Sequence, residues 1–140
     1  MPDKNKIFQL FDEVENDPKD EEKLVEEFLK SSYAKIGMFV KLIQNHEIFH
    51  KKLKKFLMKE QPNYNINSTK EASSFTVFNR AWSYIENIDI EDKDNIKSIL
   101  NFNSDLLYEV LEKSILYFES TEEYEKCGFL LKIQKILKDN

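Results

Sequence analysis

Glycine and proline are scarce in this sequence, which has two glycines and three prolines among 140 residues. A sheet protein needs such residues at its frequent turns, so their scarcity argues against a β-rich fold. The single cysteine, Cys127, excludes an intramolecular disulfide and fits a reducing compartment. We expect it to be a buried structural residue, because no histidine follows or precedes it closely.

Long apolar runs are also missing. No stretch of about 18 consecutive apolar residues exists, so we expect no membrane-spanning helix. Residues 1–17 turn acidic and lack the apolar core of a secretory signal. A cytoplasmic protein is therefore expected. The length is enough for one domain whose core needs neither disulfides nor metal.

Aromatic and charged residues are abundant, at 13% and 34% of the chain. The apolar residues recur with helical spacing, and no segment alternates as a strand would. The pattern predicts an all-α fold: a single compact bundle of about six to seven helices over residues 1–140, ending in an antiparallel helical hairpin. Within it we expect acidic N-terminal helices (1–30), a long basic helix (31–60), central helices (73–102) and the C-terminal hairpin (104–138).

Cap-forming residues suggest where these helices begin. The first helix is predicted near residues 4–16. The second follows Pro18 and is expected to bury Leu24, Val25, Phe28 and Leu29. Residues 63–72 are predicted to form a polar loop, after which Ser73 or Ser74 caps the next helix. Ser120 and Glu123 match a capping box for the last helix.

Charge is distributed unevenly around the formal net charge of −5. Residues 1–30 have a net charge of −5, residues 31–60 of +5 and residues 61–140 of −5. The basic segment either pairs with the chain's own acids or faces an anionic partner. Its candidate phosphate or anion contacts are Lys51, Lys52, Lys54, Lys55 and Lys59. A nucleic-acid accessory protein is thus one hypothesis, although the chain has a single arginine, Arg80, for base contacts.

Histidine is equally scarce, since His46 and His50 are the only two. With Glu47 between them they form H-E-x-x-H, the zinc-hydrolase signature. There the histidines bind the metal and the glutamate acts as general base on the metal-bound water. At about 100° per residue, both histidines fall within the apolar arc of their helix. The other members of that arc are Phe39, Leu42, Ile43, Phe49, Leu53 and Leu57.

A zinc site would need a third ligand from an acid such as Glu71 or Glu86, or from Cys127. The motif resembles the zincin metallopeptidases over five residues. Lys51 and Lys52 then stand where that family has uncharged and apolar residues. We therefore interpret the stretch first as part of a helix–helix interface whose imidazoles need hydrogen-bond partners. A metal-dependent hydrolase using His46, Glu47 and His50 remains the alternative, and no cofactor is otherwise expected.

The C-terminal hairpin is apolar on more than one side. In residues 104–119 the stripe predicted to point inward consists of Leu107, Leu111, Ser114 and Phe118. Leu116 points nearly opposite, and residues 129–137 also spread their apolar side chains widely. A helix apolar on most of its circumference is central or covered by something else. The predicted partner contacts are Leu116, Phe129, Ile133 and Ile136.

These patterns lead first to a non-enzymatic protein–protein interaction module, an adaptor, inhibitor or small accessory subunit. It would dock through the C-terminal hairpin onto another protein or onto a second copy of itself. Small helical chains rich in lysine and asparagine are common among accessory proteins of mobile elements, and by that association we expect such a setting. The hydrolase and the nucleic-acid accessory stand as the two alternatives.

Overall fold

The computed structural model describes residues 18–140, and every regular element within that range is an α-helix. This confirms the predicted all-α class. The helix predicted near residues 4–16 lies outside the described residues. The six helices are α2 (Pro18–Leu29), α3 (Ser32–Glu60), α4 (Ile66–Ile85), α5 (Lys93–Asn101), α6 (Ser104–Ser120) and α7 (Tyr124–Lys138).

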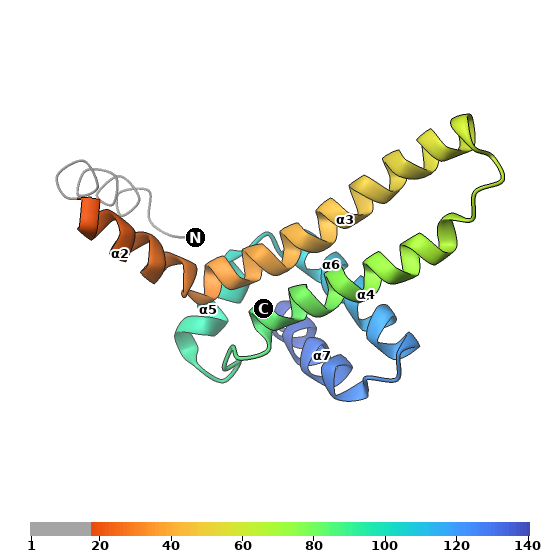
Figure 1. The fold of residues 1–140 in the computed structure, drawn as a ribbon. Coiled ribbons are helices and arrows are strands. Elements are labelled where there is room, and N and C mark those ends of the chain that lie inside the picture. Colours follow the sequence, from red (N-terminus) through yellow and green to blue (C-terminus); the bar gives the residue numbers. More distant parts are fainter. Residues whose placement is uncertain (1–17) are drawn as a thin grey trace.

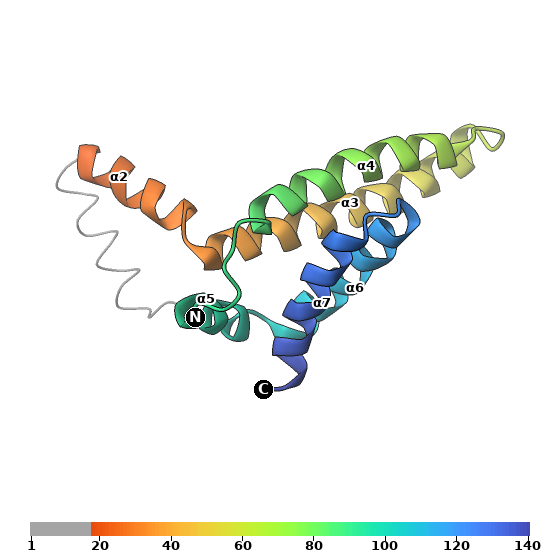
Figure 2. The ribbon, with the colours of Figure 1, turned by 90° about the horizontal axis from the view of Figure 1, so that it is seen from below.

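Two antiparallel helix pairs cross each other (Figure 1). The pair of α3 and α4 is long, and the pair of α6 and α7 packs across its middle, with α5 near the start of α3. Beyond α6 and α7, the end of α3 and the start of α4 project as a two-helix arm, which comprises residues 48–73 (Figure 2). At the opposite end, α2 projects from the start of α3. The predicted C-terminal antiparallel hairpin is present as α6 and α7.

The core lies where the two pairs cross, and α6 is its most buried helix. The stripe predicted from the sequence is buried, because Leu107, Leu111, Ser114 and Phe118 are all at most 2% exposed. In contrast, α4 is less central than predicted: only Ala81 and Ile85 are buried in it. The crossing covers α6 from both sides, whereas α4 keeps one side on the surface.

The break between α2 and α3 depends on Ser31. Its hydroxyl donates to the carbonyl of Phe28 at 2.6 Å and accepts from the backbone N–H of Ala34 at 3.3 Å. One side chain therefore closes the end of α2 and caps the start of α3. The prediction that α2 buries its apolar side is wrong for three of its four residues. Val25, Phe28 and Leu29 are 49%, 45% and 56% exposed.

The helix α4 begins earlier than predicted. Its N-cap is Asn65, whose side chain accepts from the N–H of Asn67, so residues 66–72 are helical and not a loop. Ser73 and Ser74 lie inside the helix and do not cap it. The Ser73 hydroxyl donates a hydrogen bond to the carbonyl of Thr69, four residues earlier, at 2.8 Å. Serine side chains inside helices commonly form this bond.

The turn between α6 and α7 is also closed differently from the prediction. Ser120 belongs to α6, and its hydroxyl donates to the carbonyl of Tyr117, so no capping box forms with Glu123. Instead the N–H of Glu123 bonds the carbonyl of Phe118, and the N–H of Glu122 bonds that of Glu119. These are the two bonds of a Schellman motif. Glu122 adopts the left-handed φ of 61° that this motif requires.

Candidate functional site

His46 and His50 lie on the buried side of α3, facing α4, as the helical arc predicts. They are 9% and 7% exposed, and their ring centroids lie 4.4 Å apart in an edge-to-face arrangement. The spacing of four residues places them one turn apart on the same side of the helix. They are the only buried titratable side chains of α3.

Each histidine meets a serine of α4. Nε2 of His46 lies 3.2 Å from the hydroxyl of Ser74, and Nε2 of His50 lies 2.7 Å from that of Ser73. The Ser73 hydroxyl has one hydrogen, which it donates to Thr69, so it accepts from Nε2 of His50. Nδ1 of His50 is buried without a partner in the structure. It is therefore a free position that protonation would convert into a donor.

Burial lowers the pKa of His46 below its ordinary value of 6.5. Repulsion by His50 and then Lys70 lowers this pKa further, and Glu47 opposes the shift. Desolvation disfavours the charged imidazolium, and neighbouring cations add to that cost. The surroundings of His46 thus already favour a negative charge over another positive one.

Glu47 lines the same cavity as the histidines and forms an ion pair with α6. Its carboxylate lies 2.6 Å from Nζ of Lys113, which also contacts Glu109 at 2.9 Å. Hydrogen bonds and attraction from these two acids raise the pKa of Lys113 against the effect of its burial. The glutamate of the H-E-x-x-H pattern thus bridges α3 and α6.

No third metal ligand joins the two histidines within residues 18–140, because no group of three or more His, Cys, Asp or Glu side chains there could hold an ion. Cys127 is buried on α7, where its thiol donates to the carbonyl of Ile115 at 3.6 Å. Burial, with Glu119 nearby, raises the pKa of that thiol. These are the surroundings of the structural cysteine that the sequence predicts.

A cavity of about 540 Å³ opens beside the histidines, between α3, α4 and α6. It lies where the arm leaves the crossing of the two helix pairs (Figure 1). Four lysines line it, against a single acid, Glu47, which Lys113 already neutralises. The lining residues are His46, Glu47, His50, Lys51, Lys54, Ile66, Asn67, Lys70, Ser74, Phe78, Lys113 and Tyr117.

Part of the cavity wall is aromatic. The rings of Phe78 and Tyr117 stack with centroids 4.5 Å apart and planes 10° from parallel. Both side chains are partly exposed, and Phe78 also approaches His46 edge-on at 6.2 Å. The cavity therefore combines cationic groups, hydrogen-bonding groups and a flat apolar surface, the mixture found in small-molecule sites.

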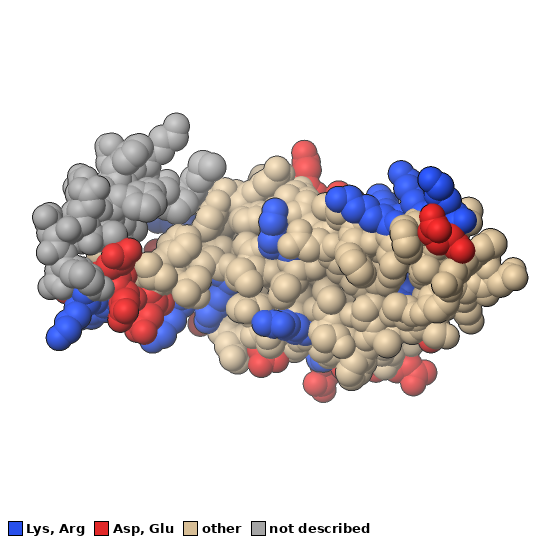
Figure 3. All heavy atoms as spheres, turned by 45° about the horizontal axis from the view of Figure 1, so that its top comes forward, with Lys and Arg blue, Asp and Glu red and all other residues tan. Residues whose placement is uncertain are grey.

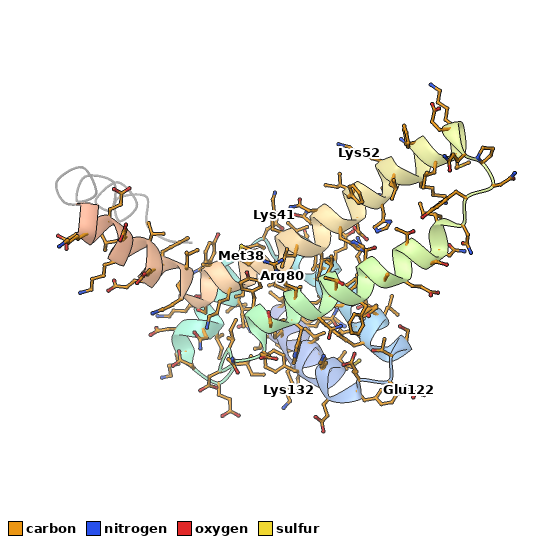
Figure 4. The ribbon with its side chains drawn as sticks, viewed as in Figure 1. Met38, Lys41, Lys52, Arg80, Glu122 and Lys132 are labelled. Atoms are coloured by element: carbon orange, nitrogen blue, oxygen red, sulfur yellow. The ribbon has the colours of Figure 1, made fainter. Side chains whose placement is uncertain are left out.

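The five lysines predicted as phosphate or anion contacts lie in two different places. Lys51 and Lys54 line the cavity, whereas Lys52, Lys55 and Lys59 are exposed elsewhere on the arm. Figure 4 shows Lys52 on the side of α3 that faces away from α4.

Sequence reasoning missed Lys70 and Lys113 because other helices contribute them. Lys70 lies in the segment predicted to be a loop. Because α4 begins at Ile66, Lys70 is helical and lies on the same face as Ser74, four residues later. A prediction of helix from residue 66 onward would have shown this.

The four predicted partner contacts of the hairpin fall in different places. Leu116 is 58% exposed and remains available to a partner. Ile133 is 4% exposed, and Phe129 and Ile136 are partly buried against the core. Phe129 contacts the ring of Trp82 edge-on at 5.3 Å. The chain's own α4 and α5 thus cover most of the surface that the sequence assigns to a partner. Ile133 is therefore a core residue and not an exposed contact.

Comparisons with known proteins give no relative. Scans of protein-family models, curated proteins and solved structures found no match to this chain. Among the described helices, none is both long and apolar enough to cross a membrane.

Proposed function

We propose that this protein is a binding module that holds a phosphate-bearing ligand of nucleotide size in the cavity between α3, α4 and α6. The observation that carries the proposal is the excess of positive charge at the cavity. Lys51, Lys54 and Lys70 line it with no acid bonded to them, and Glu47 is compensated by Lys113. Such convergence of ammonium groups is unfavourable unless an anion offsets it.

The histidine pair supports a phosphate over a carboxylate. Nδ1 of His50 has no partner, and His46 lies beside His50 and Lys70, which add to the effect of burial in lowering the pKa of His46. A multiply charged phosphate offers several acceptor oxygens, and its negative charge favours the protonated form of His46. A protonated His46 ring donates from both nitrogens, which a neutral ring cannot do.

The aromatic wall and the size of the cavity support a base or a similar ring attached to that phosphate. Small-molecule sites commonly measure about 300–1,000 Å³, and the 540 Å³ found here lies within that range. Phe78 and Tyr117 stack on each other and both line the cavity, so aromatic side chains are available there for contact with a ring of the ligand. Bases bind such surfaces by stacking, with little dependence on sequence.

Calorimetric titration with ATP and with pyrophosphate tests the proposal. The doubly substituted chain Lys54→Gln/Lys70→Gln should bind ATP at least about tenfold more weakly, because each lost charge-assisted bond contributes about 1.5–3 kcal/mol. The matched control Lys52→Gln/Lys55→Gln removes the same charge from outside the cavity and should change affinity less than about twofold. Equal losses in the two variants, or no binding by the native chain, would contradict the proposal.

A single-stranded oligonucleotide distinguishes a free nucleotide from a nucleic-acid strand. If a nucleic-acid strand is the ligand, both double variants, Lys54→Gln/Lys70→Gln and Lys52→Gln/Lys55→Gln, should bind the oligonucleotide more weakly than the native chain does. Its affinity should also fall steeply as the salt concentration rises. If a nucleotide is the ligand, pyrophosphate and ATP should shift the ring signals of His46 and His50 in NMR spectra, and the oligonucleotide should bind no better than ATP.

A further inference from the structure

Two exposed apolar surfaces lie at opposite ends of the described chain. One is on α2, where Val25, Phe28 and Leu29 are 45–56% exposed. The other is on the arm, where Phe49 and Phe56 are 59% and 60% exposed and flank the partly buried Leu53. Exposed phenylalanines grouped on one side of a helix mark an interaction surface more often than single scattered ones do.

The two surfaces carry opposite charge. Residues 18–29 contain five acids and two lysines, a net charge of −3. Residues 48–60 contain five lysines and one glutamate, a net charge of +4. In Figure 3 lysine side chains gather over the arm at one end, whereas the other end shows a group of acidic side chains with lysines beside it. The surfaces thus complement each other in charge as well as in apolar character.

The positions of the charges around each helix agree with a direct contact. At about 100° per residue, Glu22 and Asp20 flank the apolar side of α2, and Lys23 lies on its far side. On α3, Lys52 and Lys59 both lie along one edge of the side that carries Phe49 and Phe56. The lengths also agree: the 12 residues of α2 extend about 18 Å, and residues 48–60 about 20 Å.

The α2 helix cannot reach the arm of its own chain. Only residues 30 and 31 separate α2 from α3, and the arm begins at residue 48, about 24 Å along α3 from its start. Even folded back fully, α2 would end about 6 Å short of the arm. A second copy of the chain, related by a two-fold axis, would present its α2 to this arm and receive the other α2 in return.

We infer that the protein associates with a second copy of itself through reciprocal packing of α2 on the arm. The contact joins Val25, Phe28 and Leu29 of one copy to Phe49 and Phe56 of the other, and acids on α2 pair with lysines on the arm. The inference is independent of the ligand cavity, whose lysines point to another side of α3.

Sedimentation equilibrium of the full chain at low and high salt tests this inference. The native chain should be dimeric at low salt, and the dimer should weaken as salt screens the charges. Asp20→Lys/Glu22→Lys on α2 and Lys52→Glu/Lys59→Glu on the arm should each raise the dissociation constant at least about tenfold. Mixing the two variants should restore a one-to-one complex, because in the mixed dimer both reciprocal contacts again pair opposite charges, whereas each variant alone places like charges at both contacts.

The matched control is Lys132→Glu/Lys135→Glu, which reverses two exposed lysines of α7 and should leave the dimer intact. Circular dichroism shows whether each variant keeps its helices. A native chain that stays monomeric at low salt would overturn the inference and leave these surfaces to a different protein. A dimer that survives both reversals, or variants that do not complement each other, would overturn it equally.

Discussion

Nε2 of His50 lies 2.7 Å from the hydroxyl of Ser73, across the interface between α3 and α4. One turn earlier on α3, His46 meets Ser74 in the same way. Two consecutive serines of one helix therefore contact the Nε2 atoms of the two histidines of the other. The H-E-x-x-H pattern serves a polar contact between helices, and its two imidazoles line a cationic cavity.

Stability should depend on pH through His46. Its pKa in the folded chain lies below the ordinary value of 6.5, so the unfolded chain binds the proton first as pH falls. The stabilising contribution is therefore present above 6.5 and is lost as pH falls from there toward the lower pKa of the folded state. Urea unfolding at several pH values should show a smaller loss for His46→Gln than for the native chain. Equal losses would contradict the prediction.

Glu47→Gln should strengthen binding of ATP severalfold, because it removes the single acid of the cavity and one of the two carboxylates that pair with Lys113. The free energy of unfolding should change by less than about 1 kcal/mol, since the ion pair is partly exposed. Calorimetry measures the affinity. Glu109→Gln is the control, because Glu109 contacts the same lysine but does not line the cavity. A weaker complex for Glu47→Gln would show that this carboxylate contacts the ligand favourably.

Phe118→Ala should cost about 3–5 kcal/mol of unfolding free energy. This ring is fully buried and contacts Phe78 and Trp82 edge-on, so its removal leaves a cavity at the crossing of the helix pairs. Leu116→Ala, two residues earlier but 58% exposed, should change stability by less than about 0.5 kcal/mol. Denaturant unfolding compares the two. A similar cost for both variants would mean that Leu116 is covered in solution.

Glu122→Gly should stabilise the chain by about 1 kcal/mol. Glu122 has the left-handed φ of 61° at the end of α6, a conformation that costs a non-glycine residue about 1–2 kcal/mol. Part of this gain is offset by the greater freedom of glycine in the unfolded chain. Thermal unfolding measures the net effect. Glu119→Gly, inside α6, should destabilise by a similar amount.

Gly128→Ala should also stabilise, by about 0.5–1 kcal/mol. Gly128 lies inside α7, and a Cβ built there would meet nothing within 4 Å. Alanine is the better helix former because it loses less backbone entropy. The same unfolding experiment measures the effect. A loss of stability would show that another molecule packs closely against this part of α7, as it would at an interface.

Local sequence determined the helices well. Periodic apolar residues, few glycines and strong caps fixed α3, α5 and α6 to within about two residues, because these signals act within a few turns of one segment. The buried stripe of α6 followed from the same spacing. Asn65 and Ser73 are both residue types that cap helices, and the local sequence does not show which of them begins α4. The pairing of serines with histidines on α3 favours the longer α4.

Tertiary structure decided which residues surround each face of a helix. The sequence placed His46 and His50 on one side of a helix, but their contacts depend on α4. Two of the four lysines that line the cavity beside them, Lys70 and Lys113, come from two other helices. The sequence likewise could not tell that the fold buries Ile133 and leaves Phe28 exposed. Helical periodicity reports how side chains are arranged around one axis. Which helices pack against each other depends on contacts between distant parts of the chain, and the spacing of residues within one helix does not show these contacts.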